Sequence, residues 1–77
     1  MNSLSRDAVL ILQYFSFGHL PEGPLRDASA RCAGLAHDMT EMLTDGPELR
    51  MGLRKLLEAK DCFVRQALTL QREESPQ

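Results

Sequence analysis

The chain has 77 residues, a formal net charge of -2 at neutral pH, a charged fraction of 26% and a hydrophobic fraction of 43%. This length allows a single domain, and the acidic balance argues against a nucleic-acid polymer as the main partner. The apolar run at residues 9–12 is too short to span a bilayer, and the N-terminus lacks the basic region of a secretory signal. We therefore expect no membrane association and a cytoplasmic location.

The first expected element is a short helix over about residues 5–15, which a serine at its start can cap. Its apolar residues suit an arm that covers longer helices. Tyr14, Phe15 and Phe17 are three of the four aromatic residues in the chain, so aromatic rings concentrate at the end of this arm. Residues 18–24 contain two prolines and two glycines, which exclude a regular element there.

The second expected element is a helix over residues 24–43. Its apolar residues alternate between spacings of three and four, as in a seam along which two helices pack side by side. The seam comprises Leu25, Ala28, Cys32, Leu35, Met39 and Met42. Cys32 here and Cys62 in the next helix both follow the apolar pattern, which indicates reduced core residues rather than a disulfide framework.

The third expected element is a long helix over residues 47–70, which begins at Pro47 after a short turn. Its apolar stripe comprises Leu49, Leu53, Leu56, Phe63, Ala67 and Leu70. Lys60 interrupts this stripe where a further apolar residue should stand. The polar residues 71–77 should form a flexible tail, which leaves a single helical domain over residues 1–70.

These elements predict an all-α protein in which a short N-terminal helix precedes a two-helix antiparallel hairpin. Such a hairpin buries few large apolar side chains, and chains of this size usually add disulfides, a metal or further subunits. His37 and Glu41 are spaced like metal ligands but lack the third ligand that a site needs. We therefore expect no metal and no cofactor, and we expect homo-oligomerisation to complete the core.

Catalytic and DNA-reading motifs are missing from the sequence. Ser29 has no base at helical spacing, and neither a glycine-rich phosphate loop nor an HExxH or GxSxG motif occurs. A helix-turn-helix DNA-binding protein is disfavoured because both expected long helices are longer than the helices of that motif. We expect a non-enzymatic protein.

A small anionic ligand fits the remaining residues better. Residues 48–72 hold six basic and three acidic residues, so positive charge concentrates on the third expected helix. A nucleotide needs an aromatic surface for its base and fixed cations for its phosphates. The candidate ligand-binding residues are Tyr14, Phe17, Arg31, Lys60 and Arg65. The alternative is that the aromatic rings belong to the core and that the cations are solvated or interface charges.

The run FGHLPEGPLRDASARCAGLAHDMTEML, the link TDGPE and the run LRKLLEAKDCFVRQAL resemble a family of small phage proteins. This family is the phage anti-CBASS cyclic-oligonucleotide sponges, including an actinobacteriophage branch, and the likeness covers residues 14–70. It implies a short helix followed by two long ones, assembled into a hexamer that is a trimer of dimers. It also implies that the protein sequesters cyclic dinucleotides or trinucleotides, releases them unchanged, and so blocks host CBASS antiviral signalling.

The resemblance also implies individual site residues. The family's base-stacking tyrosine falls at Phe17, with Tyr14 nearby, and the arginine of its trinucleotide site falls at Arg65. Its phosphate-binding lysine falls at Cys32, which cannot bind phosphate, so Arg31 is the neighbouring substitute. The trinucleotide site thus matches the family pattern, whereas the dinucleotide site departs from it.

A second interpretation is a small helical adaptor that docks a partner helix. Its apolar faces would form the docking surface together with Met39, Met42 and Met51, because methionine side chains adapt readily to different partners.

Overall fold

The computed structural model describes residues 4–74, and all regular structure in that range is helical. Helix α1 spans Arg6–Gln13, α2 spans Pro24–Met42 and α3 spans Pro47–Glu74. The prediction of an all-α protein with three helices is therefore confirmed for this part of the chain. None of the three helices is both long and apolar enough to cross a membrane.

Local chemistry sets the start of each helix. Ser5 is the N-cap of α1, and its hydroxyl accepts a hydrogen bond of 3.1 Å from the backbone N–H of Ala8. Gly23 precedes α2 with a φ of 144°, a conformation that only glycine adopts at low cost. Pro24 and Pro47 then occupy the first helical positions, where the N–H that proline lacks has no partner in the helix.

Two helix ends differ from the sequence prediction. α1 ends at Gln13 rather than near residue 15, and Tyr14 is its C-cap. α3 continues to Glu74, beyond the expected end at residue 70. Gln, Arg and Glu are good helix formers in their own right, so the last turn forms without an apolar face. The expected tail is thus helical as far as Glu74, and residues 75–77 lie outside the described range.

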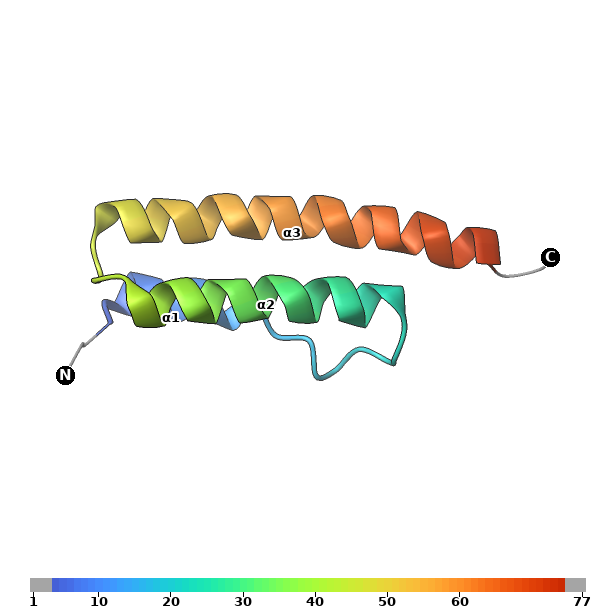
Figure 1. Ribbon diagram of the computed structural model, residues 1–77, viewed down its shortest axis with the longest axis horizontal. Coiled ribbons are helices and arrows are strands. Elements are labelled where there is room, and N and C mark those ends of the chain that lie inside the picture. Colours follow the sequence, from blue (N-terminus) through green and yellow to red (C-terminus); the bar gives the residue numbers. More distant parts are fainter. Residues whose placement is uncertain (1–3, 75–77) are drawn as a thin grey trace.

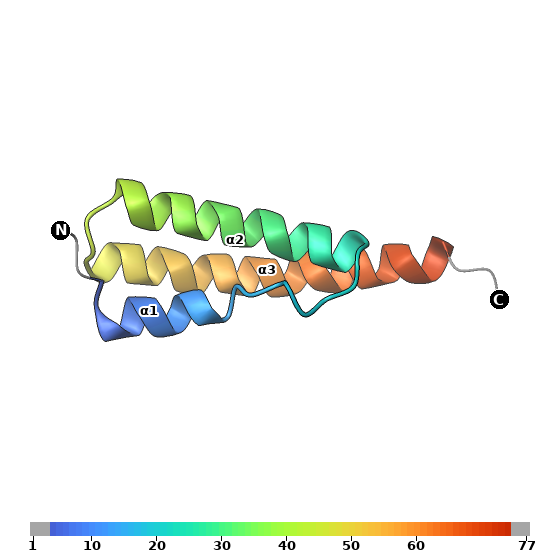
Figure 2. The same ribbon diagram turned by 90° about the horizontal axis from the view of Figure 1, so that it is seen from below.

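α2 and α3 lie side by side and run in opposite directions, joined by the turn at residues 43–46 (Figure 1). α1 packs against both helices near this turn, and residues 14–23 run back along the pair to the start of α2 (Figure 2). α3 has 28 residues against 19 in α2, so its C-terminal end projects beyond its neighbour. The molecule is therefore elongated, measuring 52 × 19 × 18 Å.

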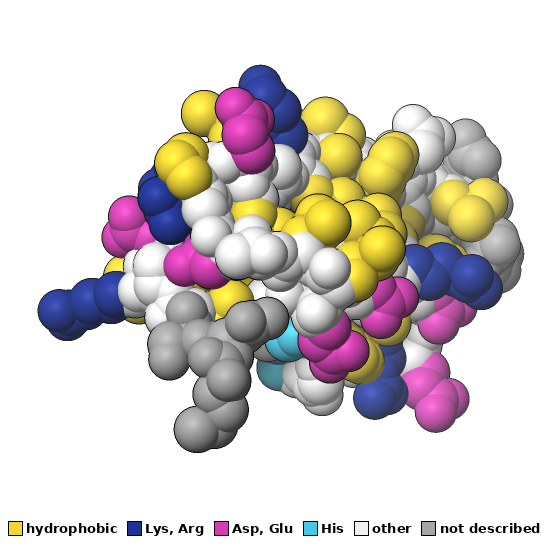
Figure 3. Space-filling view, turned by 60° about the vertical axis from the view of Figure 1, so that its left-hand side comes forward, with side chains coloured by type: hydrophobic (Ala, Val, Ile, Leu, Met, Phe, Trp, Pro, Cys, Tyr) yellow, Lys and Arg dark blue, Asp and Glu magenta, His cyan; other side chains and the backbone are white. Residues whose placement is uncertain are grey.

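The α2–α3 pair has two flanks, and α1 covers one of them. We call that side, along which residues 14–20 continue, the closed flank. The other side, the open flank, carries an apolar groove lined by Leu35, Met39, Leu43, Gly52, Leu56 and Phe63. Figure 3 turns the α2–α3 turn toward the viewer and shows apolar side chains in the middle of the visible surface, with charged side chains around them.

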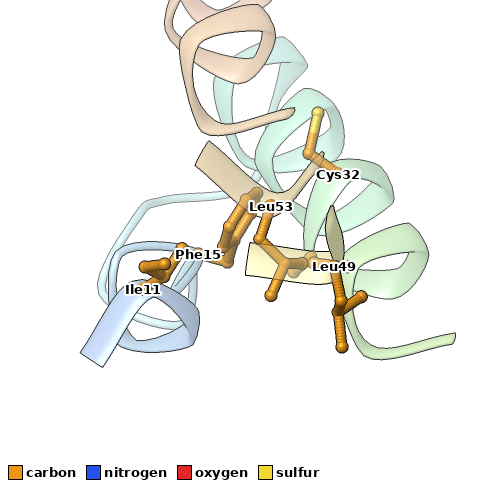
Figure 4. Close-up of a cluster of buried hydrophobic side chains, with 7 residues drawn as sticks. Ile11, Phe15, Cys32, Leu49 and Leu53 are labelled. Atoms are coloured by element: carbon orange, nitrogen blue, oxygen red, sulfur yellow. The ribbon is translucent and has the colours of Figure 1, made fainter. Parts of the chain in front are cut away.

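The core lies where α1 meets the helix pair, and it is small. Ile11 of α1 and Phe15, which follows the C-cap of α1, point toward Leu49 and Leu53 of α3 (Figure 4). Phe15 is 1% exposed and Leu53 is 2% exposed. The contribution of α2 consists of small residues, Cys32, Ala33 and Ala36, which let the other two helices approach its backbone closely.

The two cysteines have different environments. Cys32 is buried in the core, as the apolar seam predicted, whereas Cys62 is exposed. The prediction of a core position for Cys62 is therefore wrong, because that residue lies on the side of α3 turned away from the packed helices. Both thiols are free.

Candidate anion-binding site

The closed flank contains a hollow of about 300 Å³ between α2, α3 and the segment that follows α1. Its polar lining comprises Ser16, His19, Ser29, Lys60, Asp61 and Arg65. We call it the closed-flank hollow. Two of the predicted ligand-binding residues, Lys60 and Arg65, thus line the same hollow from α3.

Lys60 holds α1 in place. Its Nζ donates a hydrogen bond of 2.6 Å to the carbonyl oxygen of Tyr14, the C-cap of α1, and lies 5.9 Å from the centroid of the Phe15 ring. A cation at a helix C-terminus interacts favourably with the helix dipole, and an ammonium over an aromatic face adds a cation–π attraction. This explains why a cation interrupts the apolar stripe of α3, because its ammonium group bonds the carbonyl at the C-cap of α1. The ammonium has two further N–H donors for a ligand.

Arg65 is the exposed cation of the hollow. Its Nη2 donates to the sulfur of Cys62 at 3.3 Å, and a thiol is a weak acceptor. In the described part of the chain the guanidinium takes part in no ion pair. Its other donors are therefore available to an anion, and a guanidinium can bind phosphate oxygens in a bidentate manner.

Four further polar residues of the hollow, Ser16, His19, Ser29 and Asp61, were missed by the sequence analysis. Ser29 is 1% exposed on α2, His19 comes from the segment after α1, and Asp61 follows Lys60. Only the fold brings His19 and Ser29 to α3, so no sequence signal could have found them. The position of Asp61 was predictable from its neighbour, and its carboxylate lowers the net positive charge of the hollow.

The other predicted residues lie apart from this hollow or partly within the core. The side chain of Tyr14 is 66% exposed, whereas Phe17 is half-buried and packs against the core cluster. Tyr14 therefore offers a freer ring face than Phe17. Arg31 is exposed and lines the groove of the open flank, so the fold separates it from Arg65 within one chain.

No family model matches the chain, and comparisons with curated proteins and with solved structures give no significant match. Within the described residues, no group of three or more His, Cys, Asp or Glu side chains is placed to hold a metal.

Proposed function

We propose that this chain is a non-enzymatic phage protein that sequesters cyclic di- or trinucleotides in the host cytoplasm and thereby blocks CBASS antiviral signalling. The observation that carries the proposal is the presence of Lys60 and Arg65 in one hollow, where Lys60 also bonds the backbone carbonyl of Tyr14. Ammonium and guanidinium groups bind phosphate oxygens through charge-assisted hydrogen bonds. The ring of Tyr14 is 66% exposed, and an exposed aromatic ring can stack a base of any identity.

The size of the hollow supports self-association as part of this function. Its volume of about 300 Å³ lies at the lower end of the range for small-molecule pockets, roughly 300–1,000 Å³. A cyclic oligonucleotide has two or three nucleotide units, so one chain would hold one unit and further copies would hold the rest. The hexamer that the sequence resemblance implies would meet this need.

Ligand depletion tests the proposal directly. The purified protein is incubated at micromolar concentration with a panel of cyclic di- and trinucleotides, and free ligand is followed by chromatography. We expect depletion of at least one ligand, and its recovery unchanged after heat denaturation of the protein. Depletion of none, or recovery of a cleaved product, would contradict the proposal.

The residue assignment needs a matched pair of variants. Arg65→Ala should weaken binding about tenfold or more, because a hydrogen bond to a charged group contributes roughly 1.5–3 kcal/mol. Arg54→Ala is the control, since Arg54 is exposed on the same helix but does not line the hollow. Circular dichroism should show unchanged helicity in both. Equal binding by the two variants would mean that the site lies elsewhere.

The second candidate function is a helical adaptor that docks a partner helix. The observation that favours it is the exposure of apolar side chains: Met42 is 69% exposed, Met51 is 46% exposed, and the open flank carries an apolar groove. An adaptor would deplete no cyclic nucleotide and would retain a helical partner through this groove.

A further inference from the structure

The groove of the open flank is apolar along its length and uncovered. It runs along α2 and α3 in two adjoining sections that share Leu35 and Leu56. Leu35 is 46% exposed, Leu43 is 44% exposed and Phe63 is 56% exposed. A continuous apolar surface of this kind on a small protein marks a place where another molecule binds.

The amount of exposed surface fits a second copy of the chain. The protein exposes 5733 Å², whereas a compact folded monomer of 8.6 kDa exposes about 4,700 Å². Its radius of gyration is 14.2 Å, against about 11.5 Å for a compact domain of this length. The excess of about 1,000 Å² reflects the elongated shape, and it exceeds the roughly 800 Å² that each partner contributes to a stable interface.

The charges at the two ends of the groove are complementary to each other. Glu48 lines one end, and Arg31 lines the other end together with Phe63. Neither charge belongs to an ion pair within residues 4–74, where the salt bridge is that between Asp45 and Arg50. Such a groove, apolar along its length and with one unpaired charge of each sign at its two ends, is complementary to the same groove on a second, antiparallel copy.

The spacing along α3 sets the register of that pairing. Glu48 stands eight residues before Leu56 and Phe63 stands seven after it, which is about 12 Å and about 10 Å along a helix. A two-fold axis that crosses α3 near Leu56 therefore brings Glu48 of one copy opposite Arg31 of the other. The same axis places Phe63 of the second copy beside Leu49 and Gly52.

The glycine at position 52, inside α3, is a second and independent observation that favours this interface. Glycine inside a helix is less stable than alanine, and a Cβ added at Gly52 would meet no atom within 4 Å. Packing within the chain thus gives no reason for the missing side chain. Gly52 lines the groove without a side chain, so a large side chain of another copy can enter beside it.

We propose that the open flank is a two-fold, antiparallel interface with a second copy of this chain. Phe63 of each copy enters the groove of the other beside Gly52, and Arg31 of each copy pairs with Glu48 of the other. This assigns Arg31 to the interface rather than to a ligand. The inference rests on the self-association included in the proposed function, and it does not depend on which ligand binds.

The first test compares two leucines of equal exposure. Leu35 on the open flank and Leu10 on α1 are each 46% exposed, so glutamate at either position spares the core. Sedimentation equilibrium should show that Leu35→Glu raises the dissociation constant of the wild-type dimer about tenfold or more, because it buries an unpaired charge. Leu10→Glu should leave it unchanged. A wild type that is monomeric at tens of micromolar, or equal association by both variants, overturns the proposal.

The second test checks the register and does not depend on an apolar substitution. Arg31→Glu and Glu48→Arg should each weaken the dimer, and the double variant should restore it, because both residues are exposed and the swap recreates the pair. Failure of the double variant to recover overturns the antiparallel arrangement. A monomeric wild type that instead retains a different protein through Leu35 overturns self-docking in favour of the adaptor. A dimer that depletes no cyclic nucleotide contradicts the proposed ligand and leaves the interface standing.

Discussion

The closed and open flanks are built from the same two helices and differ in what covers them. On the closed flank Phe15, just after α1, is buried against the pair, and Lys60 bonds the carbonyl at the C-cap of α1. On the open flank Leu35 and Phe63 remain about half exposed. A short helix can cover only one side of a helix pair, so the other side of the pair remains uncovered in a single chain. The chain is too short to cover both flanks, so the closed flank carries the polar hollow beside α1 and the open flank carries the exposed apolar groove.

The largest difference should appear between the core and the exposed end of α3. Leu53→Ala removes a side chain that is 2% exposed, and the lost burial and the cavity should lower the free energy of unfolding by about 2–5 kcal/mol. Leu70→Ala is the control, because Leu70 is 45% exposed. Urea unfolding followed by circular dichroism, at one fixed protein concentration, measures both. Similar losses would mean that the core does not lie where α1 meets the helix pair.

The next largest effect concerns the tether that keeps α1 on the closed flank. The Asp45 carboxylate accepts a hydrogen bond of 2.8 Å from the backbone N–H of Ser5 and pairs with Arg50 at 3.4 Å. Asp45→Ala should cost about 1–2 kcal/mol, because it leaves partly buried donors unsatisfied. Hydrogen exchange should show that α1 loses protection before α2. Asp38→Ala, at an exposed position of α2, should change neither quantity, and an equal loss there would argue against a specific tether.

The helices were predictable from local chemistry, but the way the flanks are covered was not. Pro24, Pro47 and the N-cap at Ser5 act within a few residues of themselves, so their effects can be read in sequence order. The predicted end of α3 at residue 70 is too early, because it follows the end of the apolar stripe. A polar terminal turn needs only residues of good helix propensity, which the last residues of α3 supply.

The site was harder to predict because its residues depend on contacts between distant segments. Lys60 bonds a carbonyl 46 positions away, and nothing in the spacing of α3 indicates this. Phe17 and Tyr14 lie three positions apart, yet their burial differs because the packing of α1 turns one toward the core and the other outward. Arg31 and Arg65 are both predicted ligand-binding residues, and the sequence does not indicate that they line opposite flanks. The sequence thus indicates which kinds of residue could bind an anion, but it does not indicate which of them the fold brings together.

A smaller effect should separate the structural role of Lys60 from its role in binding. Lys60→Met keeps the apolar stem and removes the hydrogen bond to the Tyr14 carbonyl, which should cost about 1 kcal/mol because the bond is exposed to solvent. Urea unfolding should show this loss, and hydrogen exchange should show fraying at the end of α1. Lys55→Met, at an exposed position of the same helix, is the control. No difference between the two would mean that Lys60 does not hold α1 in solution.

The smallest expected effect comes from comparing Gly52, which lines the open-flank groove, with Gly34, which does not line it. A Cβ added at Gly34 or at Gly52 meets no atom within 4 Å, so alanine at either position should raise the stability of a single chain by about 0.5–1 kcal/mol. Thermal unfolding at low and high protein concentration separates the chain from the assembly, because association stabilises by mass action. The gain from Gly34→Ala should persist at both concentrations. The gain from Gly52→Ala should shrink at the higher one, because the new methyl group occupies space that the second copy needs, and equal gains throughout would place that copy elsewhere.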